Sequence, residues 1–449
     1  MRTNSNKLNA QRIFQLVRLF RMPSILVACR VAGAVSGMLA SLLLSRYYGA
    51  AQFGLIAQAL SLTMVMSIFC TLNIEAGSPR FMIAAIRKGN LLSARNYASF
   101  NFRIWAVMSA LCCLTVALWI WLQNGFISPL YLGAIIVAPL VGLTRIFAGL
   151  AMGFSKVFLA VIPRSFMRQF LFLFGVIGIT FMVGSAPVFW VLIAFGVANI
   201  GVGFLQYKSL RPLMNNLLHQ GGNGGAVYTE WQQWIKLGTI IGSSVLFIEF
   251  NQYFSVLLAG LTLSNIDVAL LDIALKIIGF VSFSIIAINQ SYLPRITQAF
   301  AVNDLAQVQA YLNQSGLIRL WVTMVIVAIF ILAAPYILAL FGPAFFDARP
   351  LFLLLLGIPI LMAIFGPAQQ ILSLIKRPSL LAILAGIAVV LLCAGVIIGG
   401  ASGGGIGAAM GVLISWVFWT VAGVFLVHRE TGLNTSVFAA FGKITKGGS

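Results

Sequence analysis

Residues 24–44 read SILVACRVAGAVSGMLASLLL, and after the short stretch SRYYGAAQ a second apolar run follows at residues 53–73, FGLIAQALSLTMVMSIFCTLN. Each run is close to the roughly 20 apolar residues that a helix needs to cross a bilayer core of about 30 Å. The first run contains one charged residue, Arg30, and the second contains none. This part of the sequence therefore predicts two membrane-spanning helices joined by a short loop.

The same length criterion, applied to the whole chain, predicts twelve spans. They cover residues 24–44, 53–73, 102–122, 131–152, 167–184, 188–207, 237–258, 268–289, 317–340, 351–375, 379–399 and 406–427. The longest polar segment, residues 208–236, contains the flexible stretch GGNGG and separates six spans from six. An even number of spans in each half gives the two halves the same orientation in the membrane.

We therefore expect an all-α polytopic membrane protein, with about twelve transmembrane helices in two six-helix halves around a central cavity. The expected parts are a basic cytoplasmic or interfacial N-terminal segment (1–23), an N-terminal half (24–207), a cytoplasmic linker (208–236), a C-terminal half (237–427) and a cytoplasmic tail (428–449). The basic and apolar residues 12–21 predict either a helix that lies on the inner leaflet or an extension of span one. Span ten holds two prolines and two glycines, which predicts a helix that can bend.

Composition excludes several classes of protein. Of the 449 residues, 61% are hydrophobic and only 8% are charged, which is too few for the surface of a soluble enzyme and too apolar for a disordered chain. The charges are unbalanced, with 28 Lys and Arg, 8 Asp and Glu and a formal net charge of +20. Because the basic residues are scattered along the chain and not gathered on one segment, we expect no nucleic-acid partner.

The loop charges predict the orientation in the membrane. If both termini are cytoplasmic, twenty-three of the 28 basic residues lie in inner segments, and only Arg46 and Arg349 lie in outer loops. Basic residues are strongly enriched in the cytoplasmic loops of membrane proteins. The inner set includes Arg164, Arg168 and Arg319, near the inner ends of spans five and nine. Most of the positive charge is therefore predicted to be a topology signal, and it also suits an anionic inner leaflet.

Three basic residues remain inside spans: Arg30, Arg145 and Lys276. A charge near the centre of a membrane helix costs a few kcal/mol, so such a residue faces a partner or a wet cavity, or its long side chain reaches the interface. Arg30 and Arg145 are about two helical turns from the inner ends of their spans, which leaves both possibilities open. We expect the acidic residues Glu75 and Asp267 to be solvated at the interfaces.

Glu249, Asp272 and Lys276 form a deeper group. Glu249 precedes the outer end of span seven and Lys276 follows the outer start of span eight, so that both lie about 12–14 Å from the outer side. Consecutive spans joined by a short loop pack side by side, so a salt bridge between Glu249 and Lys276 is available. Asp272, one turn from Lys276, is a second candidate partner. The group is interpreted either as a structural ion pair or as a switch that lines the cavity.

The sequence contains no motif for catalysis, ATP or metal binding. The phosphate-binding pattern GxxxxGK[ST] is absent, the five cysteines lie in apolar stretches, and the two histidines have no ligand spacing around them. We therefore expect neither enzymatic activity nor a metal or other cofactor. A secondary transporter, a channel or a scaffold remains, and twelve spans in two halves with a few buried charges favour the transporter.

Three short motifs resemble one family of transporters. Residues 40–55, ASLLLSRYYGAAQFGL, are similar to the LARxLGxxxFGLxA opening of the polysaccharide transporter family, the Wzx-type flippases of O-antigen and other lipid-linked oligosaccharides. Residues 289–296, NQSYLPRI, resemble its element after span eight, and residues 340–345, LFGPAF, resemble its outer turn between spans nine and ten. This family shares the multidrug/oligosaccharidyl-lipid/polysaccharide exporter superfamily with the multidrug and toxin extruders and the lipid II flippases.

The resemblance implies a multi-pass protein of the bacterial inner membrane. Its substrate would be undecaprenyl-diphosphate-linked oligosaccharide, moved from the cytoplasmic to the periplasmic leaflet by alternating access. Membrane lipids, the polysaccharide polymerase and the chain-length regulator are the other candidate partners. The segment CRVAG around Arg30 resembles the arginine region of span one in the lipid II flippases, but Ser36 stands where that region has a second basic residue.

These implications assign candidate roles to the buried charges. Arg30, Arg145 and Lys276 are the candidates for binding diphosphate or sugar, because Arg and Lys form charge-assisted hydrogen bonds with phosphate oxygens. Glu249 or Asp272 is the candidate for coupling or gating, with H⁺ or Na⁺ as the coupling ion. Two alternatives are a multidrug or cation antiporter of the sister family, which would favour buried acids, and a scaffold of the polysaccharide assembly machinery that transports nothing.

Overall fold

The computed structural model describes residues 2–182, 186–220, 231–375 and 378–440. Side chains are described from Ile25 onward, apart from those of residues 182, 218–220, 378 and most of 237–250. Within these ranges the secondary structure is entirely helical and contains no strand, as the run of apolar segments predicted.

The N-terminal half contains seven α-helices and two short turns of other helix types. They are α1 (Arg2–Thr71), the 3-10 helix η1 (Ile74–Gly77), α2 (Ser78–Arg87), α3 (Leu91–Asn124), α4 (Pro129–Gly153), α5 (Val157–Ile162), the π-helix η2 (Pro163–Met167), α6 (Arg168–Met182) and α7 (Phe189–Gln220). The C-terminal half contains α8 (Trp231–Ala259), α9 (Asn265–Ala301), α10 (Leu305–Phe341), the 3-10 helix η3 (Pro343–Ala348), α11 (Arg349–Leu355), α12 (Gly357–Phe365), α13 (Ala368–Leu374) and α14 (Pro378–Thr431).

The helices account for the twelve expected membrane crossings. Nine helical stretches among the described residues are long and apolar enough to cross a bilayer. Two of these, in α1 and α14, are each long enough for two crossings and turn at glycines, at Gly49 (φ 75°) and at Gly403 and Gly404. The 29-residue helix α8 supplies the remaining crossing. The prediction of an all-α protein with twelve transmembrane helices is therefore confirmed.

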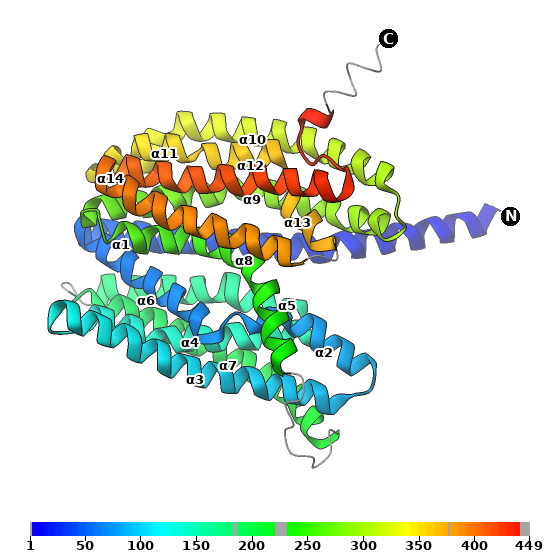
Figure 1. Cartoon of the computed structure of the whole chain (residues 1–449), viewed down its shortest axis with the longest axis horizontal. Coiled ribbons are helices and arrows are strands. Elements are labelled where there is room, and N and C mark those ends of the chain that lie inside the picture. Colours follow the sequence, from blue (N-terminus) through cyan, green and yellow to red (C-terminus); the bar gives the residue numbers. More distant parts are fainter. Residues whose placement is uncertain (1, 183–185, 221–230, 376–377, 441–449) are drawn as a thin grey trace, which may run out of the picture.

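The helices form two bundles (Figure 1). Helices α2 to α7 lie in one bundle, α9 to α14 lie in the other, and α1 and α8 pass between them. The start of α1 and the end of α14 lie at the same end of the molecule, which we call the inner end; the turns in α1 and α14 lie at the opposite, outer end. The inner end is the side that the loop charges predict to be cytoplasmic.

Several helices extend beyond their predicted spans at the inner end. α1 is continuous from Arg2, so residues 12–21 extend span one and do not form a separate helix. α7 continues to Gln220 and α8 starts at Trp231, which leaves only residues 221–230 of the expected linker, including GGNGG, outside the described residues. Hydropathy marks where a helix leaves the membrane, but its backbone hydrogen bonds can continue in water, so the helix ends later than the span.

Span ten, which was predicted to be a helix that can bend, is interrupted at one of its glycines. α12 ends at Phe365, and Gly366 has φ 78° before Pro367 and α13. A Cβ atom at Gly366 would lie 2.3 Å from the backbone oxygen of Thr435, so both the positive φ and the close approach require glycine. The break therefore brings the segment after α14 against the inner part of the C-terminal bundle.

Candidate functional site

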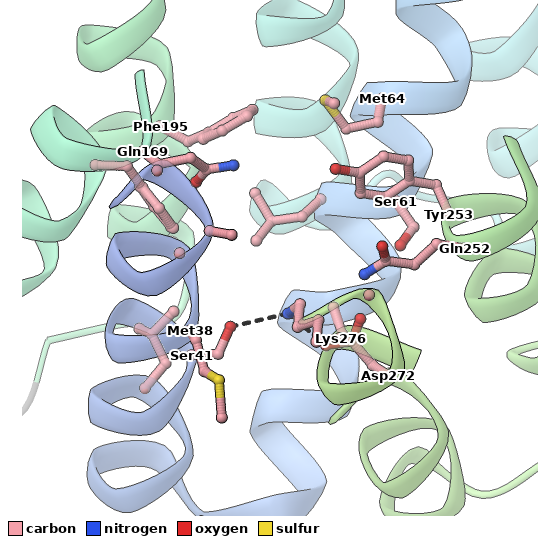
Figure 2. A pocket seen from close by; sticks show the side chains of 18 of the residues that line it. Met38, Ser41, Ser61, Met64, Gln169, Phe195, Gln252, Tyr253, Asp272 and Lys276 are labelled. Carbon is pink, nitrogen blue, oxygen red and sulfur yellow. Dashed lines mark hydrogen bonds and ion pairs between the residues drawn. The ribbon is translucent and has the colours of Figure 1, made fainter. Parts of the chain in front are cut away.

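A cavity lies between the two bundles and is lined by both crossings of α1, by α6 and α7, and by α8 and α9 (Figure 2). Two glycines of α1 let the helix approach η2 and α6 closely: a Cβ at Gly33 would lie 1.8 Å from the Ser165 backbone oxygen in η2, and one at Gly37 would lie 3.3 Å from the Gln169 side chain in α6. These contacts hold α1 against the N-terminal bundle, and the face with Ser41 points across to α9.

The outer part of the cavity has a volume of about 220 Å³ and contains one ion pair. The Lys276 ammonium group lies 2.6 Å from the Asp272 carboxylate on the preceding turn of α9, and donates a hydrogen bond to Ser41 Oγ at 2.9 Å. It also lies 5.3 Å above the Phe53 ring. The sequence analysis offered Glu249 and Asp272 as partners for Lys276; Asp272 is one of its partners, and the side chain of Glu249 lies outside the described residues.

The rest of the outer cavity is lined by aromatic rings, two amides and small polar groups. Its other walls include Met38, Ser61, Met64, Gln169, Phe172, Phe195, Gln252, Tyr253, Phe280 and Phe283. Rings that offer a flat apolar face, beside amides that both donate and accept hydrogen bonds, suit ligands with alternating apolar and hydroxyl surfaces. Sugars have this character.

The inner part of the cavity has a volume of about 500 Å³ and is strongly basic. Four arginines line it: Arg30 from α1, Arg145 from α4, Arg164 from η2 and Arg168 from α6. No carboxylate is present among its described lining residues. The two parts share the walls formed by Ala34, Met64, Arg168, Gln169, Gln252, Tyr253 and Phe283, so they form one continuous space.

Arg164 and Arg168 are the site residues that sequence reasoning missed. The sequence analysis assigned both to the cytoplasmic topology signal, because span five was expected to begin at residue 167. The helical segment instead begins at Val157, and the π-helical turn η2 carries Arg164 into the cavity wall. Single π-helical turns inside α-helices occur frequently at functional sites. The four-residue spacing of the two arginines is the signal in the sequence, because residues i and i+4 share a helix face.

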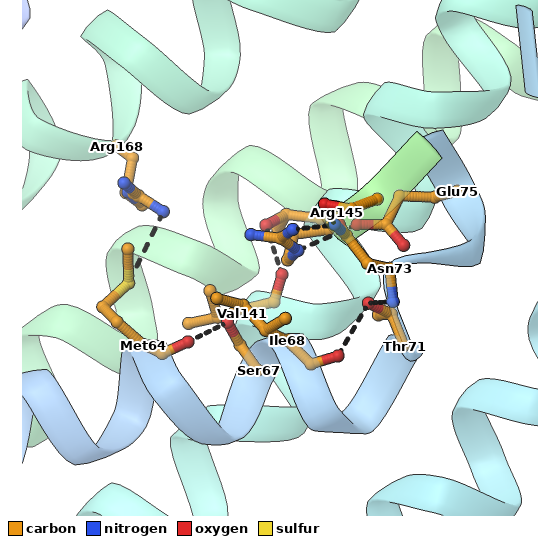
Figure 3. Close-up of polar contacts among 11 residues, drawn as sticks. Met64, Ser67, Ile68, Thr71, Asn73, Glu75, Val141, Arg145 and Arg168 are labelled. Carbon is orange, nitrogen blue, oxygen red and sulfur yellow. Dashed lines mark hydrogen bonds and ion pairs between the residues drawn. The ribbon is translucent and has the colours of Figure 1, made fainter. Parts of the chain in front are cut away.

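Arg168 is held firmly at the boundary between the two parts of the cavity. It is 8% exposed, and its guanidinium carbon lies 5.9 Å from the centroid of the Phe195 ring. One of its terminal nitrogens also contacts the sulfur of Met64 at 4.0 Å (Figure 3). A cation held by an aromatic face retains its charge, so Arg168 adds to the positive potential of both parts.

Arg145 is buried and does not reach the membrane interface. It is 5% exposed, its Nε atom donates to Glu75 Oε1 at 2.9 Å, and its Nη2 atom donates to Asn73 Oδ1 at 2.6 Å (Figure 3). The expectation that Glu75 is solvated at an interface is therefore wrong, since Glu75 is 4% exposed and ion-paired. A Cβ at Gly149 would lie 2.7 Å from Glu75, so α4 packs tightly over this carboxylate and excludes solvent.

Arg319 is a third basic residue that the loop-charge count misplaced. It is completely buried in α10, where its Nε atom donates to the backbone oxygen of Ala363 at 3.0 Å and its Nη1 atom to Asn289 Oδ1 at 3.1 Å. Ala363 lies in α12, one turn before the break at Gly366. Arg319 therefore holds the interrupted span ten against α9 and α10, away from the cavity.

This position predicts a loss of stability when Arg319 is replaced by Met, which has similar bulk but cannot donate. Two buried acceptors would lose their donor, at about 1–3 kcal/mol each, so we expect R319M to lower the apparent unfolding temperature in detergent by several degrees. The matched control is R295M, because Arg295 is exposed on α9. If R319M unfolds at the same temperature as R295M and the unchanged protein, Arg319 does not have this structural role.

The outer end of the cavity is closed by contacts between the two halves. Arg46 Nε donates to the backbone oxygen of Leu340 at 2.6 Å and Arg46 Nη2 to that of Ala339 at 2.8 Å, while Ser45 Oγ donates to Phe341 at 3.1 Å. These oxygens belong to the last turn of α10, whose carbonyls lack partners within the helix and whose dipole attracts a cation. Arg46, expected only as an outer-loop charge, thus joins α1 to α10.

These features together define a polytopic helical membrane protein with a cavity between two helical halves, closed at its outer end and basic at its inner end. The chain matches no family model and no curated protein sequence. Its fold is similar to those of solved transporters of the MOP superfamily. An inward-facing multidrug resistance MATE family transporter aligns over 90% of this chain and 98% of its own, with a TM-score of 0.70 and 13% identity.

Two other structures share this fold. The lipid II flippase MurJ, in an inward closed conformation, aligns over 90% of this chain and 87% of its own, with a TM-score of 0.69 and 15% identity. An outward-facing MATE family transporter aligns over 91% of this chain and 96% of its own, with a TM-score of 0.58 and 14% identity. Those neighbours are transporters and a flippase, and at these identities the likeness establishes the fold.

Proposed function

We propose that the protein is a flippase that moves an isoprenoid-diphosphate-linked oligosaccharide from the inner to the outer leaflet of the membrane by alternating access. The observation that carries this proposal is the inner cavity, where four arginines from four different helical segments face one space. Arg145 is paired with Glu75, but the described lining of the inner cavity contains four guanidinium groups and no carboxylate, so its positive potential favours an anionic ligand. A diphosphate supplies such an anion, and guanidinium groups bind its oxygens through charge-assisted hydrogen bonds.

The two parts of the cavity fit the two polar parts of such a substrate. The diphosphate would lie among Arg30, Arg145, Arg164 and Arg168 in the inner part of the cavity. The sugar would extend into the outer part, against the rings of Phe172 and Phe195 and the amides of Gln169 and Gln252. The isoprenoid tail would remain in the bilayer, because moving it through a basic cavity would cost its hydrophobic transfer energy.

The structure fits the stage of transport at which substrate is loaded. Contacts of Arg46 with the last turn of α10, and of the Phe53 ring with the Phe345 ring at 6.2 Å, close the outer end. The likeness to the inward-facing transporter, which exceeds that to the outward-facing one, supports this interpretation. We also propose that both termini are cytoplasmic, that the membrane is the bacterial inner membrane, and that the segments 24–207 and 237–427 move as the two halves.

Lys276 and Asp272 are our candidates for linking substrate binding to an ion. Their pair lies at 2.6 Å in the outer part of the cavity, where an approaching anionic or hydroxyl group competes with Asp272 for the ammonium group. An Asp272 carboxylate released from Lys276 would be free to interact with a coupling cation, for which H⁺ and Na⁺ are the candidates. Glu249 remains a second candidate, because the sequence predicts that it lies deep within span seven. The polysaccharide polymerase and chain-length regulator remain proposed partners.

A multidrug or cation antiporter is the alternative that the shared fold supports. An organic cation is best held by carboxylates in a cavity, and the described lining contains one carboxylate, Asp272, which is neutralised by Lys276. The balance of charge therefore favours an anionic substrate. A scaffold without transport is a third possibility, which the test below also addresses.

The proposal predicts translocation by the purified protein in proteoliposomes. A fluorescent disaccharide linked to a short isoprenoid diphosphate is expected to move between leaflets at least tenfold faster than in vesicles without protein, as measured by quenching of the label at the outer surface. The control substrate is the same disaccharide on an isoprenoid alcohol, which lacks the anion. Equal rates with and without protein would contradict the flippase, and uptake of an organic cation such as ethidium would favour the antiporter.

A further inference from the structure

Asn73 occupies an unusual position where the second crossing of α1 ends. The chain turns sharply there, and Leu72 (φ 48°) and Asn73 (φ 56°) both have left-handed backbone conformations before η1 begins. Asn73 is 4% exposed, and its backbone N–H donates to Thr71 Oγ1 at 3.2 Å. Asparagine tolerates this conformation better than most residues, but the same tolerance would allow aspartate. The backbone therefore does not explain why an amide stands here.

The amide of Asn73 joins the cavity to the other half of the protein. Its Oδ1 atom accepts from Arg145 Nη2 at 2.6 Å (Figure 3). Its Nδ2 atom donates to the backbone oxygen of Gly242 in α8 at 2.8 Å. A guanidinium group can only donate and a carbonyl oxygen can only accept, so the two partners determine the orientation of the amide. Only a side chain that both accepts and donates can satisfy both partners.

The contact with α8 is tightly packed. A Cβ at Gly242 would lie 2.7 Å from Asn73 Nδ2, and a Cβ at Gly238, one turn earlier, would lie 3.2 Å from the Cα of Ile74. The hydroxyl of Tyr97 donates to the backbone oxygen of Ile74 at 2.7 Å, which anchors η1 to α3 from the other side. Because α8 is the first helix of the C-terminal half, this contact between η1 and α8 is a joint between the halves at the inner end.

We propose that Asn73 links the occupancy of the arginine cavity to this joint. This inference rests on the proposed function, because it requires an anionic substrate that draws on Arg145. Arg145 lines the cavity, but its Nε atom is engaged by Glu75 and its Nη2 atom by Asn73. An anion bound in the cavity competes for the same guanidinium group. As Arg145 turns toward that anion, Asn73 Oδ1 loses the hydrogen bond that it accepts from Arg145. The Asn73 side chain is then no longer held in the orientation in which Nδ2 donates to the Gly242 oxygen, and the joint is weakened.

The link assigns Asn73 a positioning role, distinct from binding the substrate. Asn73 is not among the residues that line either part of the cavity, so it acts through Arg145. Substitution by aspartate separates the two contacts of the amide. The carboxylate of the N73D variant would still accept from Arg145, but it would face the Gly242 oxygen with a second oxygen and repel it. The N73D variant therefore keeps the cavity side of the link and removes the joint side.

The test measures anion binding and movement of the outer end in the same full-length protein. Farnesyl diphosphate serves as the probe, in nanodiscs, and spin labels are attached at Gln123→Cys and Ser402→Cys, exposed sites at the outer ends of the two halves. The five native cysteines are replaced by serine in this background. We expect the probe to lengthen the distance between the labels in the parent protein. In N73D we expect binding within about threefold of the parent and no lengthening.

A control and a second variant complete the design. N90D makes the same chemical change at the N-cap of α3, an exposed position at the inner end, and should respond as the parent does. G242A leaves Asn73 and Arg145 intact but places a methyl group against the joint, and should also bind without lengthening. If N73D does not fold, G242A tests the link by itself. If the probe lengthens the label distance in N73D or G242A as much as in the parent, the link through Asn73 is overturned and the proposed function stands. If the parent protein does not bind the diphosphate, the proposed function and the link are both overturned.

Discussion

Replacing Arg164 and Arg168 together by glutamine is expected to reduce translocation of the isoprenoid-diphosphate substrate at least about 100-fold. Both side chains line the inner cavity, one from η2 and one from the first turn of α6. A hydrogen bond to a charged group is worth about 1.5–3 kcal/mol, so two of them contribute about 3–6 kcal/mol to holding a diphosphate. Since 1.4 kcal/mol is a factor of ten in an equilibrium constant, losing about 3 kcal/mol or more from these two residues weakens diphosphate binding at least about 100-fold.

The measurement is the leaflet-exchange rate in proteoliposomes, together with the affinity for farnesyl diphosphate. The matched control is the double variant K156Q/K208Q, which removes two exposed basic residues from the same inner end of the protein. Both variants weaken the topology signal equally, so the orientation of the protein in the vesicles serves as a further check. If both variants transport at similar rates, the two arginines act as topology signals and do not bind the substrate.

Replacing Gly54 by Ala is expected to prevent the outer end from closing and to abolish the transport cycle. A Cβ at Gly54 would lie 1.8 Å from the backbone oxygen of Asn265, at the start of α9, so α1 and α9 could not approach as they do here. Backbone atoms cannot yield as flexible side chains can, and the two halves must separate at this point. Separation would also break the contacts of Arg46 and Ser45 with α10, which lie on the same side.

Labelling of a buried thiol measures the closure. Phe345 is 1% exposed and packs against Phe53 at the outer end, so the Phe345→Cys side chain should resist a membrane-impermeant maleimide in the parent and react in the G54A background. The control is G178A, because a Cβ at Gly178 meets no atom within 4 Å. A transport rate in G54A that matches G178A, with no increase in labelling, would show that closure does not depend on this contact.

The helical architecture was predictable because it depends on local properties of the sequence. A run of about 20 apolar residues requires a helix to satisfy its backbone hydrogen bonds in lipid, whatever its neighbours are. A deviation of span ten from a straight helix was predictable as well, since Gly366 and Pro367 act on their own backbone, although the prediction was a bend and the structure has a break. The positions at which the helices end on the inner side were not predictable, because hydropathy falls where a helix enters water although the helix itself continues.

The candidate site was only partly predictable. Arg30, Arg145 and Lys276 stood out because they interrupt apolar runs, and all three line the cavity in the structure. Arg164 and Arg168 did not stand out, because basic residues at the inner end of a span are what the orientation of any membrane protein requires. Their role in the cavity depends on how far span five extends and on the π-helical turn that rotates its residues.

The sequence alone thus determined the class of the protein, the number of its spans, the predicted orientation and the charges that lie deepest within apolar runs. Tertiary structure decided which partners the remaining charges have: Glu75 is buried with Arg145, Arg319 is buried between α9 and α12, and the exposed Arg46 bonds across the two halves. The physical reason is that insertion into a membrane depends on the length and polarity of each segment by itself. Pairing of charges depends on the rotation and depth of helices that are far apart in the chain, which only their packing specifies.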